Sequence, residues 1–153
     1  MRTLVVYDSK FGNTEQLARG IARRLEALGP VEARAVDGAY PRLAERVNLL
    51  VLGGPTEGHG MSSRMRAFTD TFAASSLAGT RVAVFDTRFR MSPLLTGSAA
   101  KRIARRLRLL GVPLVTPPES FFVTRKGEPQ LEQGERERAE TWADTLKASV
   151  LPV

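Results

Sequence analysis

The chain of 153 residues is 42% hydrophobic and 25% charged, which is ordinary for one globular domain and excludes a fibre or a disordered tail. It contains no cysteine, so disulfide bonds and thiolate catalysis are excluded as well. The apolar start, residues 4–7, is too short for a secretory signal or a membrane span, and we expect a cytoplasmic protein.

The net charge of +7 is concentrated in one region. Residues 81–126 contain ten Lys or Arg residues and only two acidic ones, which favours a solvated basic face or a docking surface for an acidic partner. Nucleic acid is not the favoured partner, because aromatic side chains are not interleaved with the arginines as single-strand binding usually requires.

Short apolar runs rich in β-forming residues recur along the chain and predict strands that are buried on both faces of a sheet. The second segment differs, because apolar and charged residues alternate in it, and we place it at an edge of the sheet. The predicted strands are residues 4–7, 31–36, 49–52, 82–85 and 112–115, with 121–123 resuming the last.

Between the strands, apolar residues recur at helical spacing and predict helices at 17–28, 65–72, 100–110 and 139–146. Strands that alternate with helices indicate an α/β fold with an open parallel sheet, right-handed crossovers and helices on both faces. We detect no linker or repeat, so residues 1–153 are expected to form a single domain. In such sheets ligands bind at the carboxyl ends of the strands.

The loop after the first strand leads directly into a helix. It offers backbone N–H groups at a helix N-terminus, hydroxyls at Ser9 and Thr14, the amide of Asn13 and a tight turn at Gly12. A phosphate fits such a loop. The alternative is that Asn13 or Thr14 only caps the helix. Neither of the common glycine-rich nucleotide motifs occurs in the chain.

The pattern Ser9-x-x-Gly12-Asn13-Thr14-Glu15 resembles the FMN phosphate loop of the flavodoxin family, and the resemblance extends over essentially the whole chain. It implies a flavodoxin-like, doubly wound sheet of five parallel strands in the order 2-1-3-4-5. Flavodoxin is the usual example of this strand order, and FMN binds it where the order reverses.

The same resemblance implies which groups hold the FMN phosphate. Two positions that commonly carry hydroxyls in the family are Lys10 and Phe11 here, so a hydroxyl donor is lost, while Lys10 supplies a positive charge. The implied phosphate ligands are the side chains of Ser9, Asn13 and Thr14 and the N–H groups of Lys10, Phe11 and Gly12.

The loop after the third strand is rich in glycine, which lets a backbone approach a flat ligand closely. Flavodoxins usually stack an aromatic side chain on the flavin from this loop, and only His59 is present for that role. The segment that continues to Phe68 is similar to the NAD(P)H:quinone oxidoreductase branch of the same superfamily. The FMN contacts expected from this loop are Pro55, Thr56, Glu57, Gly58 and His59.

The loop after the fourth strand contacts the pyrimidine edge of the flavin in the family. Flavodoxins typically place acidic residues around the flavin, whereas this loop carries Arg88 and Arg90, so we expect a less negative hydroquinone potential. The alternative is that both arginines point to solvent and Asp86 pairs with one of them. The expected contacts are Asp86, Thr87, Arg88 and Phe89.

Three functions from different classes remain open. The favoured one is an FMN electron carrier that docks redox partner proteins, acidic ones in particular, near the flavin edge and the basic region 81–126. The second is an FMN-dependent NAD(P)H:quinone-type reductase, and the third is a flavin-free interaction module. The single His gives no zinc site and no Ser-His-Asp constellation is supported, so any chemistry belongs to the cofactor.

Overall fold

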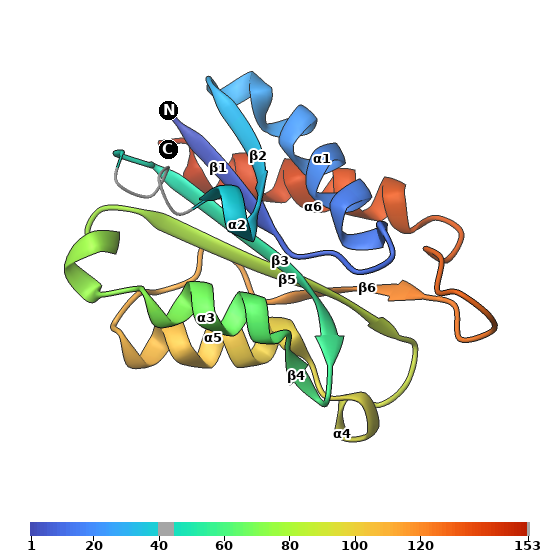
Figure 1. Ribbon diagram of the computed structural model, residues 1–153. Coiled ribbons are helices and arrows are strands. Elements are labelled where there is room, and N and C mark those ends of the chain that lie inside the picture. Colours follow the sequence, from blue (N-terminus) through green and yellow to red (C-terminus); the bar gives the residue numbers. More distant parts are fainter. Residues whose placement is uncertain (40–44, 153) are drawn as a thin grey trace.

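The computed structural model describes residues 1–39 and 45–152, with a β-sheet at its centre (Figure 1). The described strands are β1 (Thr3–Tyr7), β2 (Val31–Ala35), β3 (Leu49–Glu57), β4 (Gly60–Met61), β5 (Arg81–Phe89) and β6 (Glu119–Val123). All but the short β4 pair in parallel, in the order β2-β1-β3-β5-β6. In chain order this is 2-1-3-4-5, so the predicted α/β class and strand order are confirmed.

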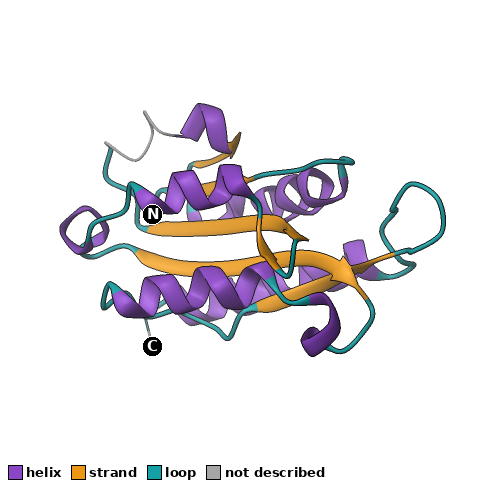
Figure 2. Ribbon diagram, turned by 60° about the horizontal axis from the view of Figure 1, so that its bottom comes forward, coloured by secondary structure: helices purple, strands orange, loops and turns teal. Residues whose placement is uncertain are grey.

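Helices cover both faces of the sheet (Figure 2). One face carries α1 (Asn13–Leu25) and α6 (Glu135–Val150), and the other carries α3 (Ser63–Asp70) and α5 (Ala99–Leu109). The shorter helices of the described chain are α2 (Val36–Ala39), α4 (Pro93–Thr96), and the 3-10 turns Glu26–Leu28 and Ala74–Leu77.

The central strands are buried on both sides because successive side chains point to opposite faces. In β3, Leu49 and Val51 pack with α1 and α6, while Leu50 and Leu52 pack with α3 and α5. Each of these four side chains is fully buried, which contributes about 1.5–3 kcal/mol per side chain. This double burial explains why β1, β3 and β5 have continuous apolar sequences rather than alternating ones.

The ring of Trp142 on α6 packs edge to face against the rings of Phe85 on β5 and Phe121 on β6. The centroid of Trp142 lies 5.8 Å from that of Phe85 and 6.0 Å from that of Phe121. Trp142 therefore belongs to the core, and the cluster fixes α6 against β5 and β6.

The prediction of a strand at 112–115 is wrong. Leu114 forms only an isolated parallel bridge with Val82, and the last strand is β6. Pro113 and the pair Pro117-Pro118 lack an N–H to donate to a ladder, so the chain cannot pair continuously here. The apolar character of this segment instead serves packing against α5, where Val112 is buried.

The strands β3 and β5 are longer than their apolar runs predict. β3 continues to Glu57 and β5 to Phe89, so residues expected in loops extend the sheet instead. The extensions place the ends of both strands beside the loop that follows β1. The predicted domain, residues 1–153, includes 40–44 and 153, which lie outside the described residues. Among the helices that are described, none has the length and apolar character needed to cross a bilayer.

Candidate functional site

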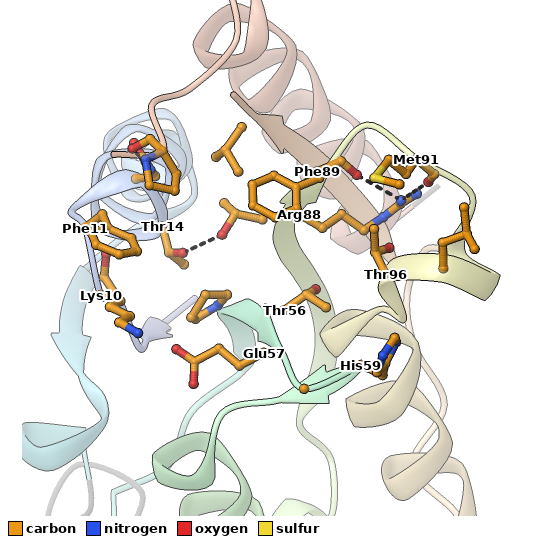
Figure 3. Close-up of a pocket in the computed structure, with 18 residues that line it drawn as sticks. Lys10, Phe11, Thr14, Thr56, Glu57, His59, Arg88, Phe89, Met91 and Thr96 are labelled. Carbon is orange, nitrogen blue, oxygen red and sulfur yellow. Dashed lines mark hydrogen bonds between the residues drawn. The ribbon is translucent and has the colours of Figure 1, made fainter. Parts of the chain in front are cut away.

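A cavity of about 430 Å³ opens at the carboxyl ends of β1, β3 and β5 (Figure 3). Three segments distant in sequence form its walls: the loop after β1, the end of β3 with its hairpin, and the end of β5 with α4. All of the predicted site residues except Gly12 and Asp86 line this cavity. The predicted residues that line it are Ser9, Lys10, Phe11, Asn13, Thr14, Pro55, Thr56, Glu57, Gly58, His59, Thr87, Arg88 and Phe89.

The loop after β1 turns at Gly12, whose φ of 87° lies in the left-handed region that favours glycine. Helix α1 begins at the next residue without a side-chain cap from Asn13 or Thr14, so the capping alternative is not what the structure shows. The Ser9 hydroxyl instead accepts a hydrogen bond from the Glu15 N–H at 3.2 Å. Within the described chain, the N–H groups of residues 10–14 donate no hydrogen bond, and all of these residues except Gly12 line the cavity.

Two side chains of this loop connect it to other elements. The Asn13 amide donates to the carbonyl oxygen of Pro129 at 2.8 Å, which holds the 124–134 segment against the loop. The hydroxyl oxygens of Thr14 and Thr87 lie 3.0 Å apart and share a buried hydrogen bond, which connects the loop to β5. Both contacts fix the loop without using its backbone N–H groups.

The hairpin between β3 and β4 forms the second wall. His59 adopts a φ of 66°, unusual for a residue with a side chain, and its backbone forms a parallel bridge with Gly97. A Cβ on Gly97 would lie 2.0 Å from the His59 carbonyl oxygen, so only glycine permits this approach. The side chain of His59 lies at the cavity wall (Figure 3).

The structure places Asp86 behind the cavity wall rather than on it. Its side chain is fully buried, and Oδ2 accepts hydrogen bonds from Ser98 Oγ at 2.6 Å, the Ala100 N–H at 3.0 Å and Thr56 Oγ1 at 3.3 Å. Asp86 therefore does not pair with Arg88 or Arg90, and that alternative is wrong.

Arg88 lies in the cavity wall and is held in place by several contacts. Its Nε donates to Ser120 Oγ at 3.0 Å and its Nη1 to the Met91 carbonyl oxygen at 2.7 Å. No carboxylate in the described chain pairs with this guanidinium. Arg90, in contrast, forms an ion pair with Glu132 at 2.9 Å and does not line the cavity. The two arginines therefore differ in both position and charge compensation.

Met91, which the sequence offers beside Phe89 as a residue to stack on the flavin, also lines the cavity. Four further lining residues were not predicted from the sequence. They come from α4, from β6 and from the loop that follows β6, where no local motif indicates a site: Leu95, Thr96, Val123 and Pro129. Only the structure shows that these segments close the cavity.

The fold and this loop define a doubly wound α/β protein with a loop of unused backbone N–H groups at the point where the strand order reverses. The chain belongs to the flavodoxin family, whose model, described as flavodoxin, matches residues 5–142. None of the curated proteins compared with the chain matches it.

Several solved structures share the fold. Flavodoxin 2 from Bacillus cereus is 23% identical with a TM-score of 0.75, over 97% of this chain and 99% of that one. A flavodoxin from the domain Archaea is 20% identical, with the same TM-score and the same coverage. The WrbA-like flavodoxin from Agrobacterium tumefaciens is 17% identical with a TM-score of 0.70, over 97% of this chain and 96% of that one.

Membership of the flavodoxin family implies FMN as the cofactor and electron transfer to redox partners as the activity. The residues present fit this group. The unused N–H groups of residues 10–14 and the charge of Lys10 suit a phosphate, and the apolar cavity beside them suits a flat ring. The left-handed turn at Gly12 leaves open space where a side chain would otherwise stand.

Proposed function

We propose that this chain is a one-domain FMN electron carrier acting in the cytoplasm. The observation that carries the proposal is the set of unused backbone N–H groups at residues 10–14, which adjoins an apolar-walled cavity at the switch point of the sheet. Bound FMN supplies the electron-accepting and electron-donating chemistry, and the protein binds it, orients it and shields it from water.

The phosphate is held by the N–H groups of residues 10–14, by the Lys10 charge and by the hydroxyls of Ser9 and Thr14. The Ser9 oxygen accepts from Glu15, so its own O–H is available to donate to a phosphate. Asn13 acts indirectly, because its amide is already engaged with Pro129.

The flavin ring occupies the cavity between the β3–β4 hairpin and the end of β5 with α4. The residues that contact it are drawn from Pro55, Thr56, Glu57, Gly58, His59, Thr87, Arg88 and Phe89. Phe89 and His59 are the cavity-lining side chains of these walls with aromatic rings suited to stacking.

The redox partners are acidic proteins that dock near the flavin edge and over the basic region 81–126. Leu94 is 94% exposed and Leu95 62% exposed on α4, beside the cavity. On α5, exposed cations without an ion pair in the described chain continue from this rim: Lys101, Arg102, Arg105 and Arg108. This surface has an apolar centre surrounded by basic residues, so it suits a partner whose apolar surface is surrounded by acidic residues.

Assays on purified, FMN-loaded protein distinguish the electron carrier from the NAD(P)H:quinone-type reductase, a function that the comparisons do not favour. The carrier is reduced by dithionite and passes electrons to ferricyanide, but it does not oxidise NADH or NADPH steadily in the presence of a quinone. Sustained turnover of either nucleotide by the protein alone would contradict the proposal and support the reductase.

A further inference from the structure

Asp86 connects the end of β3, which lines the cavity at Thr56, to the start of α5, which follows the cavity-lining Thr96. Its Oδ2 accepts hydrogen bonds from Thr56 at the end of β3 and from Ser98 and the Ala100 N–H at the start of α5. The side chain is fully buried and touches solvent nowhere. One carboxylate oxygen therefore holds the extended end of β3 and the N-terminus of α5 together.

The two hydroxyls in this network act as both donors and acceptors. Thr56 Oγ1 donates to Asp86 and accepts the Ala99 N–H at 3.1 Å. Ser98 Oγ donates to Asp86 and accepts the Lys101 N–H at 3.2 Å as the cap of α5. The first N–H groups of α5 therefore all donate to acceptors in this one buried cluster. A carboxylate at the N-terminus of α5 also interacts favourably with the helix dipole.

A backbone contact supports the same junction from the cavity side. The bridge between His59 and Gly97 joins the β3–β4 hairpin to the residue before Ser98, with no side chain between them. Thr56, His59 and Thr96 all line the cavity, so the Asp86 cluster and this bridge together determine how far apart these parts of the wall stand.

We propose that Asp86 is a positioning residue, which fixes the spacing between the β3–β4 hairpin and the segment that joins α4 to α5 and so sets the width of the flavin cavity. It does not touch the cofactor. The consequence for FMN rests on the proposed function, whereas the clamp itself does not.

The first test compares Asp86→Ala and Asp86→Asn with Ile103→Ala, which removes a buried side chain from α5 outside the cluster. We expect Asp86→Ala to raise the dissociation constant for FMN at least about tenfold, because three donors lose their acceptor. Asp86→Asn retains a carbonyl oxygen and stays within about threefold of the wild type. Ile103→Ala lowers the melting temperature but changes the dissociation constant less than about twofold.

Equal weakening of FMN binding by Asp86→Ala and Ile103→Ala at matched loss of melting temperature would overturn the proposal, since Asp86 would then be merely structural. Failure of Asp86→Asn to rescue binding relative to Asp86→Ala would overturn it too. The visible circular dichroism of bound FMN gives a second readout, which should change in Asp86→Ala and not in Ile103→Ala.

A glycine pair tests the junction without altering the carboxylate. Gly97 and Gly111 both have a positive φ, 71° and 75°, so Ala strains the backbone at both, and more so at Gly97, whose ψ of −175° is adopted essentially by glycine alone. The effects on FMN binding are therefore compared relative to the loss of melting temperature in each variant. A new Cβ meets the His59 carbonyl at position 97 and open space at position 111. Gly97→Ala should weaken FMN binding at least about tenfold while Gly111→Ala leaves it unchanged; equal effects would contradict the proposal.

Hydrogen exchange of the FMN-free protein separates the clamp from the proposed function. In Asp86→Ala the amides of residues 56–60 and 97–100 should exchange at least about tenfold faster than in Ile103→Ala. That result supports the clamp even if the wild type does not bind FMN, an outcome that would refute only the proposed function. Unchanged exchange in these segments would refute the clamp whatever the cofactor does.

Discussion

Thr14 and Thr87 share a buried hydrogen bond, with their hydroxyl oxygens 3.0 Å apart, although the two residues are separated by 73 positions in sequence. The pair joins the proposed phosphate loop to the end of β5, which also lines the cavity. Both side chains line the cavity, so the hydrogen bond couples the position of the loop to that of the end of β5.

Replacing either threonine by valine should therefore affect folding and binding differently. We expect Thr14→Val and Thr87→Val each to lower the free energy of unfolding by about 1–2 kcal/mol, because each leaves a buried hydroxyl unpaired. Thr14→Val should weaken FMN binding more, since its hydroxyl adjoins the phosphate loop. Denaturant unfolding of both single variants and the double variant measures the coupling, and strictly additive losses would show that the hydroxyls do not interact.

Arg88 should raise the reduction potential of bound FMN. An uncompensated positive charge in the cavity wall favours the reduced flavin, which carries more negative charge, by on the order of 1 kcal/mol. Arg88→Ala should accordingly lower the potential by on the order of tens of millivolts. Arg90→Ala is the matched control and should have a smaller effect, because Glu132 already neutralises Arg90. An unchanged or raised potential in Arg88→Ala would refute this role.

The basic surface should favour anionic electron acceptors. Oxidation of the reduced protein by ferricyanide should slow as salt is added, because screening weakens the attraction. The single variant Arg102→Glu should lower the low-salt rate severalfold. Arg23→Glu on α1 provides the control, since it changes the same charge on the other face of the sheet. Equal losses from both faces would show that only the net charge matters.

Glu135 should make stability depend on pH. Burial opposes its ionisation, but hydrogen bonds from Arg138 and from the Phe122 N–H lower the pKa of this carboxyl below its ordinary value. A carboxyl with a depressed folded pKa stabilises the protein above the unfolded value, about 4.3, and that contribution disappears as pH falls through the folded pKa.

The difference in unfolding free energy between the wild type and Glu135→Gln should therefore be about 2 kcal/mol at pH 7 and should shrink below about pH 4. Urea denaturation across this range measures it. A difference that stays constant down to the lowest pH would mean that ionisation of Glu135 does not contribute.

The parts of the fold encoded locally could be predicted from sequence. Continuous apolar runs such as Leu49–Leu52 arise from burial on both faces, and they located the central strands correctly. The run at 112–115 misled because its apolar side chains pack against α5 while its prolines prevent pairing. Periodicity reports burial, and it does not distinguish a strand from an extended packed segment.

The candidate site divides in the same way. The loop around Gly12 carries its own signature of turn, hydroxyls and helix start. The place of Asp86 could not be predicted, because its partners Ser98 and Ala100 reach it only through tertiary folding. Pro129 likewise joins the cavity through the amide of Asn13, a contact that leaves no local pattern in the sequence.

FMN binding through the phosphate loop is tested most directly by titrating the purified, flavin-free protein with FMN. Flavin fluorescence follows the titration, which is repeated with riboflavin. We expect one FMN bound per chain and much weaker binding of riboflavin, because the N–H groups of residues 10–14 act on the phosphate. No binding of FMN at concentrations on the order of 100 μM, or equal affinity for riboflavin, would contradict it.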